Sequence, residues 1–165
     1  MFENLKAAKA VGVTLSGLKG PSAESGHRSW TAHILFYGAR VGNASGSDIK
    51  REIKLIIDDA LMQQMVDVLK AGGFRIDATK PAKRSFDTNT ARGYMSLAVA
   101  QIADEMDQVK ELKVAARSQT LILLRSAPTK VTVFGERFTP AVKARLSAQY
   151  GDDLIEFVNE ALKGL

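Results

Sequence analysis

The sequence contains no cysteine and only two histidines among its 165 residues. Without a thiol the chain cannot form a disulfide bond, a thiolate metal site or a cysteine nucleophile. No apolar run approaches the roughly 20 residues that cross a bilayer, and the N-terminus lacks the apolar segment of a secretory signal. These absences predict a cytoplasmic protein that makes no contact with membranes.

Aromatic residues are also few, at 7% of the chain, which limits the number of rings available for stacking on a ligand. The rest of the composition is that of an average soluble domain, with 45% hydrophobic and 25% charged residues. A chain of this length buries enough surface to need no disulfide or metal for stability. The formal net charge of +5 favours contact with polyanions.

Two pairs of apolar segments rich in β-branched and aromatic residues predict β-hairpins. The first pair is 30–37 and 49–57, joined by a long turn at 38–48, and the second pair is 119–125 and 130–134. In the second pair, residues 121–124 are apolar on both faces, which is typical of a central strand.

The remaining segments have the apolar periodicity or the end signals of helices. They are residues 2–11, 59–71, 90–112, 140–150 and a last segment that begins at Asp152. Antiparallel hairpins separated by helices indicate an α+β fold. We expect a small, mostly antiparallel sheet built from two β-hairpins and packed against several helices.

Residues 12–26 are rich in glycine, serine and proline, which is typical of a linker. The sequence therefore predicts a flexible N-terminal arm. The expected organisation is an N-terminal helix and arm in 1–27, followed by a single α+β domain in 28–165.

The first predicted strand carries both aromatic and basic side chains. Arg28, Trp30 and Arg40 lie on or beside it, and Lys50 and Lys54 alternate along the strand with which it pairs. Aromatic rings on a sheet face, flanked by cations, are a common arrangement for holding single-stranded nucleic acid. The alternative is that these aromatic residues belong to the core, since strands are rich in such residues in any case.

A second basic cluster, Lys80, Lys83 and Arg84, lies between two predicted helices and beside a proline. Such a loop can contact phosphates without reading sequence. It can equally be a solvated connection. A helix-turn-helix near the C-terminus is disfavoured, because Asp152 and Asp153 would stand where a recognition helix meets the phosphates.

Signals for catalysis are weak. His27 and His33 have no cysteine and no cluster of carboxylates beside them, so they make a poor metal site. Glu52 and Lys54 are spaced as in some metal-dependent nucleases, but the second carboxylate that this chemistry needs is missing upstream. The sequence therefore predicts no catalytic residue, no metal and no cofactor, and favours a binding protein over an enzyme.

The function that we expect is sequence-independent binding of single-stranded nucleic acid through a basic and aromatic sheet face. The predicted binding residues are Arg28, Trp30, Arg40, Lys50, Lys54, Lys80, Lys83 and Arg84. The alternative is a protein that works through a protein partner or through self-association. It would then be a homo-oligomeric assembly component of a phage or plasmid, or an inhibitor of a larger machine. A metal-dependent phosphodiesterase is a third and more remote alternative.

Overall fold

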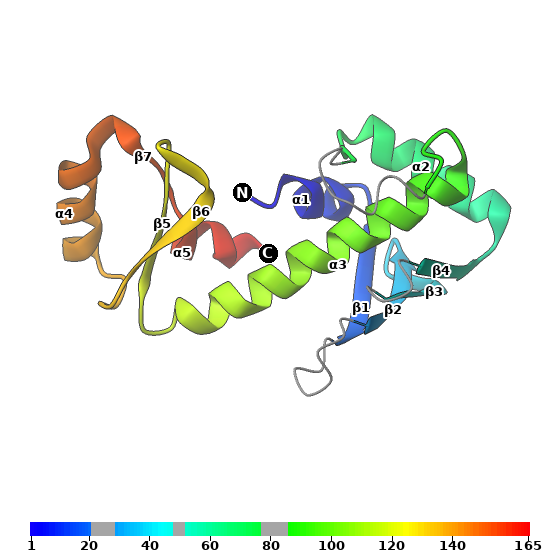
Figure 1. Ribbon diagram of the computed structural model, residues 1–165, viewed down its shortest axis with the longest axis horizontal. Helices are drawn as coiled ribbons and strands as arrows, with labels where there is room; N and C mark the ends of the chain where they lie inside the picture. The colour runs from blue at the N-terminus through cyan, green and yellow to red at the C-terminus, as the bar shows by residue number, and fades with distance from the viewer. Residues whose placement is uncertain (21–28, 48–51, 77–85) are drawn as a thin grey trace. The chain divides into compact units, whose positions relative to one another are not determined.

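A computed structural model describes residues 1–20, 29–47, 52–76 and 86–165 (Figure 1). The chain divides into two compact units, Phe2–Met106 and Asp107–Leu165, and Met1 groups with the second. Each unit combines helices with an antiparallel sheet, so the predicted α+β class is confirmed. The two predicted hairpins lie in separate sheets, one in each unit.

The N-terminal unit holds a four-stranded sheet with the strand order β1-β2-β3-β4. Its elements are α1 (Glu3–Ala10), β1 (Val13–Lys19), β2 (Ser29–Phe36), β3 (Ala39–Ser47), β4 (Glu52–Ile57), α2 (Asp59–Ala71) and the first part of α3 (Ala91–Ala115). All three strand pairs are antiparallel. Figure 1 shows α3 crossing the strands of this sheet.

Two of these strands replace segments that the sequence analysis assigned to loops. The prediction of a flexible arm is wrong for residues 13–19, which form β1 and pair with β2. The alternation of buried Val13 and Leu15 with half-buried Thr14 and Ser16 is that of a strand with one apolar face. The four glycines and the proline of residues 12–26 hid this pattern.

The long turn predicted at 38–48 is also wrong, because Ala39–Ser47 form β3. The actual turn is Tyr37-Gly38, in which both residues have positive φ angles of 48° and 83°. Two consecutive positive φ angles are typical of the tight turn that joins the strands of a two-residue hairpin. The glycines that suggested a loop lie instead inside the strand, where a neighbouring strand or side chain approaches closely.

The helices of this unit largely follow their predictions. α1 buries Phe2, Leu5 and Ala8, and α2 begins after Asp58, whose carboxylate accepts a hydrogen bond of 3.0 Å from the backbone N–H of Leu61. This capping bond satisfies an N–H group that has no partner within the helix. The core of the unit combines the apolar sheet face with buried residues of all three helices, including Met65, Leu69, Met95, Val99 and Ile102.

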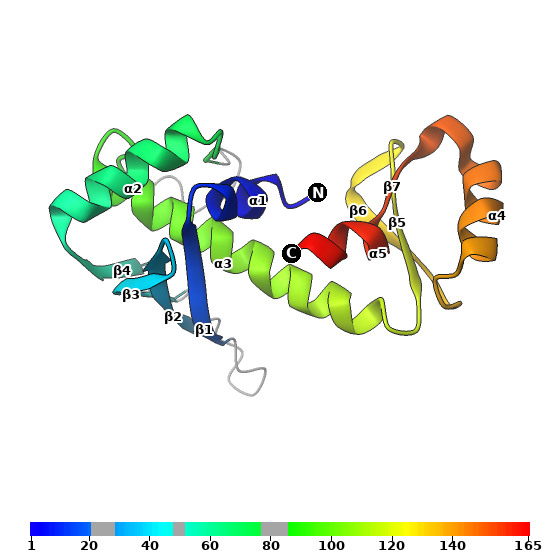
Figure 2. The ribbon, with the colours of Figure 1, turned by 180° about the vertical axis from the view of Figure 1, so that it is seen from behind.

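The C-terminal unit holds a three-stranded sheet with the order β6-β5-β7 (Figure 2). Its elements are the end of α3, β5 (Thr120–Leu124), β6 (Ala127–Phe134), α4 (Pro140–Tyr150), β7 (Leu154–Phe157) and α5 (Val158–Ala161), with short 3₁₀ turns at Gly151–Asp153 and Leu162–Gly164. β5 is fully buried and central, as predicted. One face of the sheet packs on α4 through Ile122, Leu124, Leu146 and Phe157.

The last predicted helix is only partly present. Residues 154–157 form β7, which pairs antiparallel with the second edge of β5, and α5 has only four residues. The apolar residues of this segment fit either a helix or a strand. The open edge of the buried strand β5 decides between them, because its backbone groups need partners.

The division of the chain into two compact units does not fall at residue 28, where the sequence analysis placed a boundary. Residues on both sides of that boundary belong to the same unit, and the division falls within α3. Among the described residues, no helix is both long enough and apolar enough to cross a membrane.

Candidate nucleic-acid interface

The four-stranded sheet has one apolar face and one polar face. Along β2, Ala32 and Ile34 are buried, whereas Thr31 is exposed and His33 is only half-buried. The neighbouring strand β3 has the same apolar and polar faces, because buried Ala32 stands opposite buried Ala44. We call the face that carries Thr31 and His33 the open face.

One row of the open face runs across all four strands. Lys19 stands opposite Thr31, Thr31 opposite Ser45, and Ser45 opposite Lys54. Adjacent strands lie about 4.8 Å apart, so the two lysine backbones at the ends of the row are separated by about 14 Å. Two cations thus flank a middle of small hydroxyl side chains.

A β-bulge in β1 brings Lys19 to this face. Ser16 pairs with His33 and Lys19 with Thr31, so β1 uses three steps where β2 uses two. The extra residue adopts a left-handed conformation at Gly17, with a φ angle of 60°. Without the bulge, strict alternation would place Lys19 on the opposite face from Ser16.

A second bulge, in β3, does the same for Arg40. Ile34 pairs with Gly42 but Leu35 pairs with Arg40, so β3 contains one residue more than β2 at this point. Arg40 therefore shares a face with Asn43, and its Nη2 donates a hydrogen bond of 2.7 Å to Asn43 Oδ1. Bulges are frequent next to functional sites, where they redirect a side chain.

The open face carries an excess of positive charge. Lys19, Arg40 and Lys54 are all exposed, and none of them forms an ion pair with another described residue. Within the described part of the chain, Glu52 is the carboxylate that shares the face, at its outer end. Unpaired cations on a polar surface attract polyanions.

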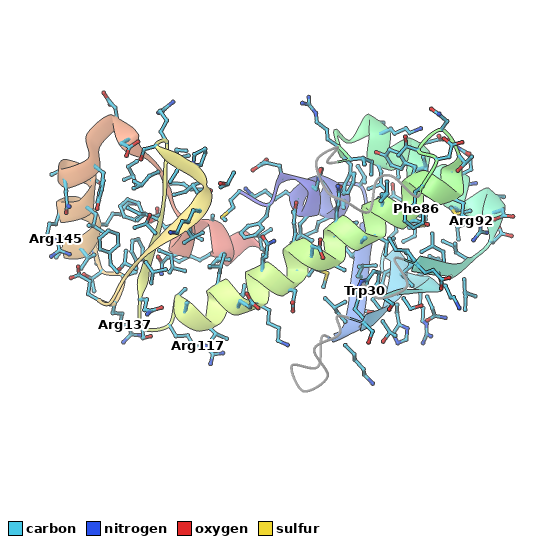
Figure 3. All side chains as sticks on the ribbon, in the orientation of Figure 1. Trp30, Phe86, Arg92, Arg117, Arg137 and Arg145 are labelled. Atoms are coloured by element: carbon cyan, nitrogen blue, oxygen red, sulfur yellow. The ribbon has the colours of Figure 1, made fainter. Side chains whose placement is uncertain are left out.

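A hollow of about 700 Å³ lies over the open face, lined by the row of Lys19, Thr31, Ser45 and Lys54 and by Asn43. At its rim, α3 begins beside β4 (Figure 3). There the Arg92 guanidinium donates to the Leu55 carbonyl oxygen at 3.3 Å and pairs with Asp59 at 2.6 Å. Arg92 therefore covers part of the free edge of β4 rather than serving as a free cation.

The structure brings two of the predicted binding residues, Arg40 and Lys54, to the open face, but it places Trp30 on the opposite face. Trp30 pairs with Gly46 and is half-buried, and its indole lies against the Gly46 backbone, where a Cβ atom would collide with it. The tryptophan is therefore not beside the cations with which the sequence analysis grouped it.

The other five predicted residues, Arg28, Lys50, Lys80, Lys83 and Arg84, lie outside the described residues. Their part in binding stays a prediction.

Sequence reasoning missed Lys19 and assigned no role to Asn43. Lys19 was placed in a linker, and a bulge that redirects a side chain leaves no regular pattern in a sequence. Asn43 was placed in the long turn predicted at 38–48, because the glycines of that segment suggested a loop. The alternation in residues 13–16 was the one signal that could have revealed β1.

Within the described residues, no group of three or more histidine or acidic side chains is placed to hold a metal ion. Comparison with known proteins finds no family model, no curated protein and no solved structure that matches this chain. The functional argument therefore rests on the geometry of the open face.

Proposed function

We propose that this protein binds single-stranded nucleic acid through the open face of its four-stranded sheet, without reading base sequence. The observation that carries the proposal is the convergence of Lys19, Arg40 and Lys54 on one polar face, two of them by means of β-bulges. Irregularities that each add a cation to the same face are better explained by an anionic ligand than by packing, because none of these side chains is buried.

Contacts to the nucleic acid would be made mainly with its backbone. The lysines neutralise phosphates and release counterions, and the hydroxyls of Thr31 and Ser45 donate to phosphate oxygens. Among the described residues the open face presents no phenylalanine, tyrosine or tryptophan in these rows, so base stacking contributes little there. The hollow favours a flexible single strand over a duplex, which is stiff and convex.

Fluorescence anisotropy with labelled single strands and duplexes, at low and moderate salt, tests this proposal. For single strands, each lost phosphate contact lowers the slope of log affinity against log salt by roughly 0.7. We therefore expect Lys19→Ala/Lys54→Ala to weaken binding and to flatten the slope by about 1.4. Lys163→Ala, which removes an exposed lysine of the other unit, is the matched control and should change little. Unchanged binding by the double variant would contradict the proposal.

A second candidate function is self-association or binding of a protein partner through the same face. It is favoured by Ile56, an apolar side chain on the open face that is 71% exposed. Light scattering over a range of concentrations tests it. An oligomer that Ile56→Asp dissociates would support this function, and a monomer at all concentrations would exclude self-association.

A further inference from the structure

A chain of hydrogen bonds orients His33 at the centre of the open face. Arg40 Nη2 lies 2.7 Å from Asn43 Oδ1, and His33 Nδ1 lies 2.8 Å from the same oxygen. His33 and Asn43 are directly opposite each other on β2 and β3. The imidazole ring is therefore held by its Nδ1 side toward β3.

These contacts determine which nitrogen of His33 carries the proton. Arginine has donors only, so the atom of the Asn43 amide that faces Arg40 must be its oxygen. An amide oxygen accepts hydrogen bonds, so Nδ1 of His33 must be the donor in its own contact with that oxygen. In the neutral ring the lone pair is then on Nε2, which becomes a hydrogen-bond acceptor.

The space beside Nε2 is left open by a glycine. A Cβ atom at Gly17 would lie 3.6 Å from Nε2 and 3.3 Å from Cδ2 of His33. The bulge that brings Lys19 to the open face therefore also leaves Nε2 uncovered on the β1 side. Within the described part of the chain, Nε2 has no hydrogen-bond partner.

His33 Nε2 is a hydrogen-bond acceptor, whereas the charged groups around it are donors. Lys19, Arg40 and Lys54 can only donate, and they suit phosphate oxygens. A neutral imidazole nitrogen repels a phosphate oxygen, because both atoms present lone pairs. It needs a ligand group that carries an O–H or N–H and that lies close to the phosphates.

On this basis, and resting on the proposed function, we propose that His33 Nε2 accepts a hydrogen bond from a ribose 2′-hydroxyl, so that the open face binds RNA in preference to DNA. The sugar is favoured over the base, because the lysines hold the phosphate backbone against the sheet and the described rows offer no phenylalanine, tyrosine or tryptophan ring on which a base could stack. The 2′-hydroxyl is the group by which proteins distinguish the two nucleic acids.

The test compares single strands of one sequence made of RNA, DNA and 2′-O-methyl RNA, all at one mildly alkaline pH. One hydrogen bond corresponds to a preference for RNA of about fivefold. The methyl group removes the donor, so 2′-O-methyl RNA should bind as weakly as DNA. His33→Ala should abolish the preference for RNA, because it removes the acceptor.

Lys54→Ala is the matched control, because it should weaken binding of all three strands and preserve their ratio. Equal affinity for RNA and DNA would overturn the inference and leave the proposed function intact. An RNA preference that survives in His33→Ala or with 2′-O-methyl RNA would also overturn it. The comparison of strands on the unaltered protein remains decisive even if His33→Ala does not fold. Failure to bind any of the three strands would overturn the proposed function together with the inference.

Discussion

Asn159 is a buried polar residue of the C-terminal unit, and its side-chain amide joins the ends of two elements. Its Oδ1 accepts a hydrogen bond of 2.7 Å from the backbone N–H of Leu121, and its Nδ2 donates to the carbonyl oxygen of Gln119 at 2.9 Å. The side chain is 8% exposed, so water cannot replace these bonds. Asn159 thereby ties α5 to the start of the central strand β5.

Replacing this amide should therefore be costly. Asn159→Ala leaves the buried Leu121 N–H and the part-buried Gln119 carbonyl without their side-chain partner, and we expect the free energy of unfolding to fall by about 2 kcal/mol. Urea denaturation measures the change. Gln149→Ala, which removes an exposed amide from the same unit, is the control and should have little effect. Similar stabilities for the two variants would show that Asn159 does not join these elements.

Tyr94 should make the stability of the N-terminal unit fall at high pH. Its hydroxyl donates to the Phe74 carbonyl oxygen at 3.2 Å, and burial raises the pKa of its phenol above the ordinary value. The folded state thus favours the protonated phenol. This contribution to stability is complete below the unfolded pKa of about 10 and is lost as the pH rises through the folded pKa.

We expect Tyr94→Phe to lower the free energy of unfolding by about 1 kcal/mol at neutral pH, through loss of the hydrogen bond. Above the ordinary tyrosine pKa, the difference between the natural protein and this variant should shrink or reverse, because phenylalanine has no proton to lose. Tyr37→Phe is the control, since Tyr37 is 71% exposed. Parallel pH profiles for the natural protein and Tyr94→Phe, measured by chemical denaturation, would contradict this account.

The strand β3 depends on glycine where Trp30 crosses it. A Cβ atom at Gly46 would collide with the indole, so Gly46→Ala should destabilise the N-terminal unit by about 1–3 kcal/mol through overpacking. In a protein that already carries Trp30→Ala, adding Gly46→Ala should cost no further stability, because the indole is gone. Gly135→Ala, at a site with nothing within 4 Å of the added carbon, is the control. Thermal unfolding of Gly46→Ala, Trp30→Ala, the double variant and Gly135→Ala measures these costs. An equal cost of Gly46→Ala with and without Trp30 would refute the collision.

The elements that sequence could predict are those whose pattern is local. The helix that follows the Asp58 cap and the fully apolar strand 120–124 show their character within a few residues. β3 and β7 could not be predicted from a local pattern in this way. In β3 the glycines serve a neighbouring indole and strand, and in β7 the edge of β5 selects strand over helix. These causes lie elsewhere in the chain and act only after folding.

The candidate site was predictable to a similar degree. Lys54 could be placed on a polar sheet face from residue type and alternation, and it lies there. Arg40 was predicted beside the strand, and it reaches the same face through the bulge in β3. Lys19 depends on a bulge and Trp30 on the register of β2 against β3, and neither can be read from spacing alone. Of the residues predicted for the basic face, Arg40 and Lys54 thus lie on one face of the sheet and Trp30 lies on the other.

At the scale of the whole molecule, the net charge of +5 is not by itself an argument for binding, because it counts residues on every surface. The argument lies in where the cations are. The open face belongs entirely to the N-terminal unit, whereas the C-terminal unit is built around its own small core. The proposed binding of nucleic acid therefore belongs to the N-terminal unit.

A nuclear magnetic resonance titration of the full chain with a short single-stranded RNA tests this claim most directly. We expect the amide signals of Thr31, His33, Asn43 and Ser45 to shift, while the indole N–H signal of Trp30 stays in place because it lies on the opposite face. Signals from β5 and α4 in the other unit should also be unaffected. Shifts confined to the C-terminal unit or centred on Trp30, or no shifts at all, would contradict the account.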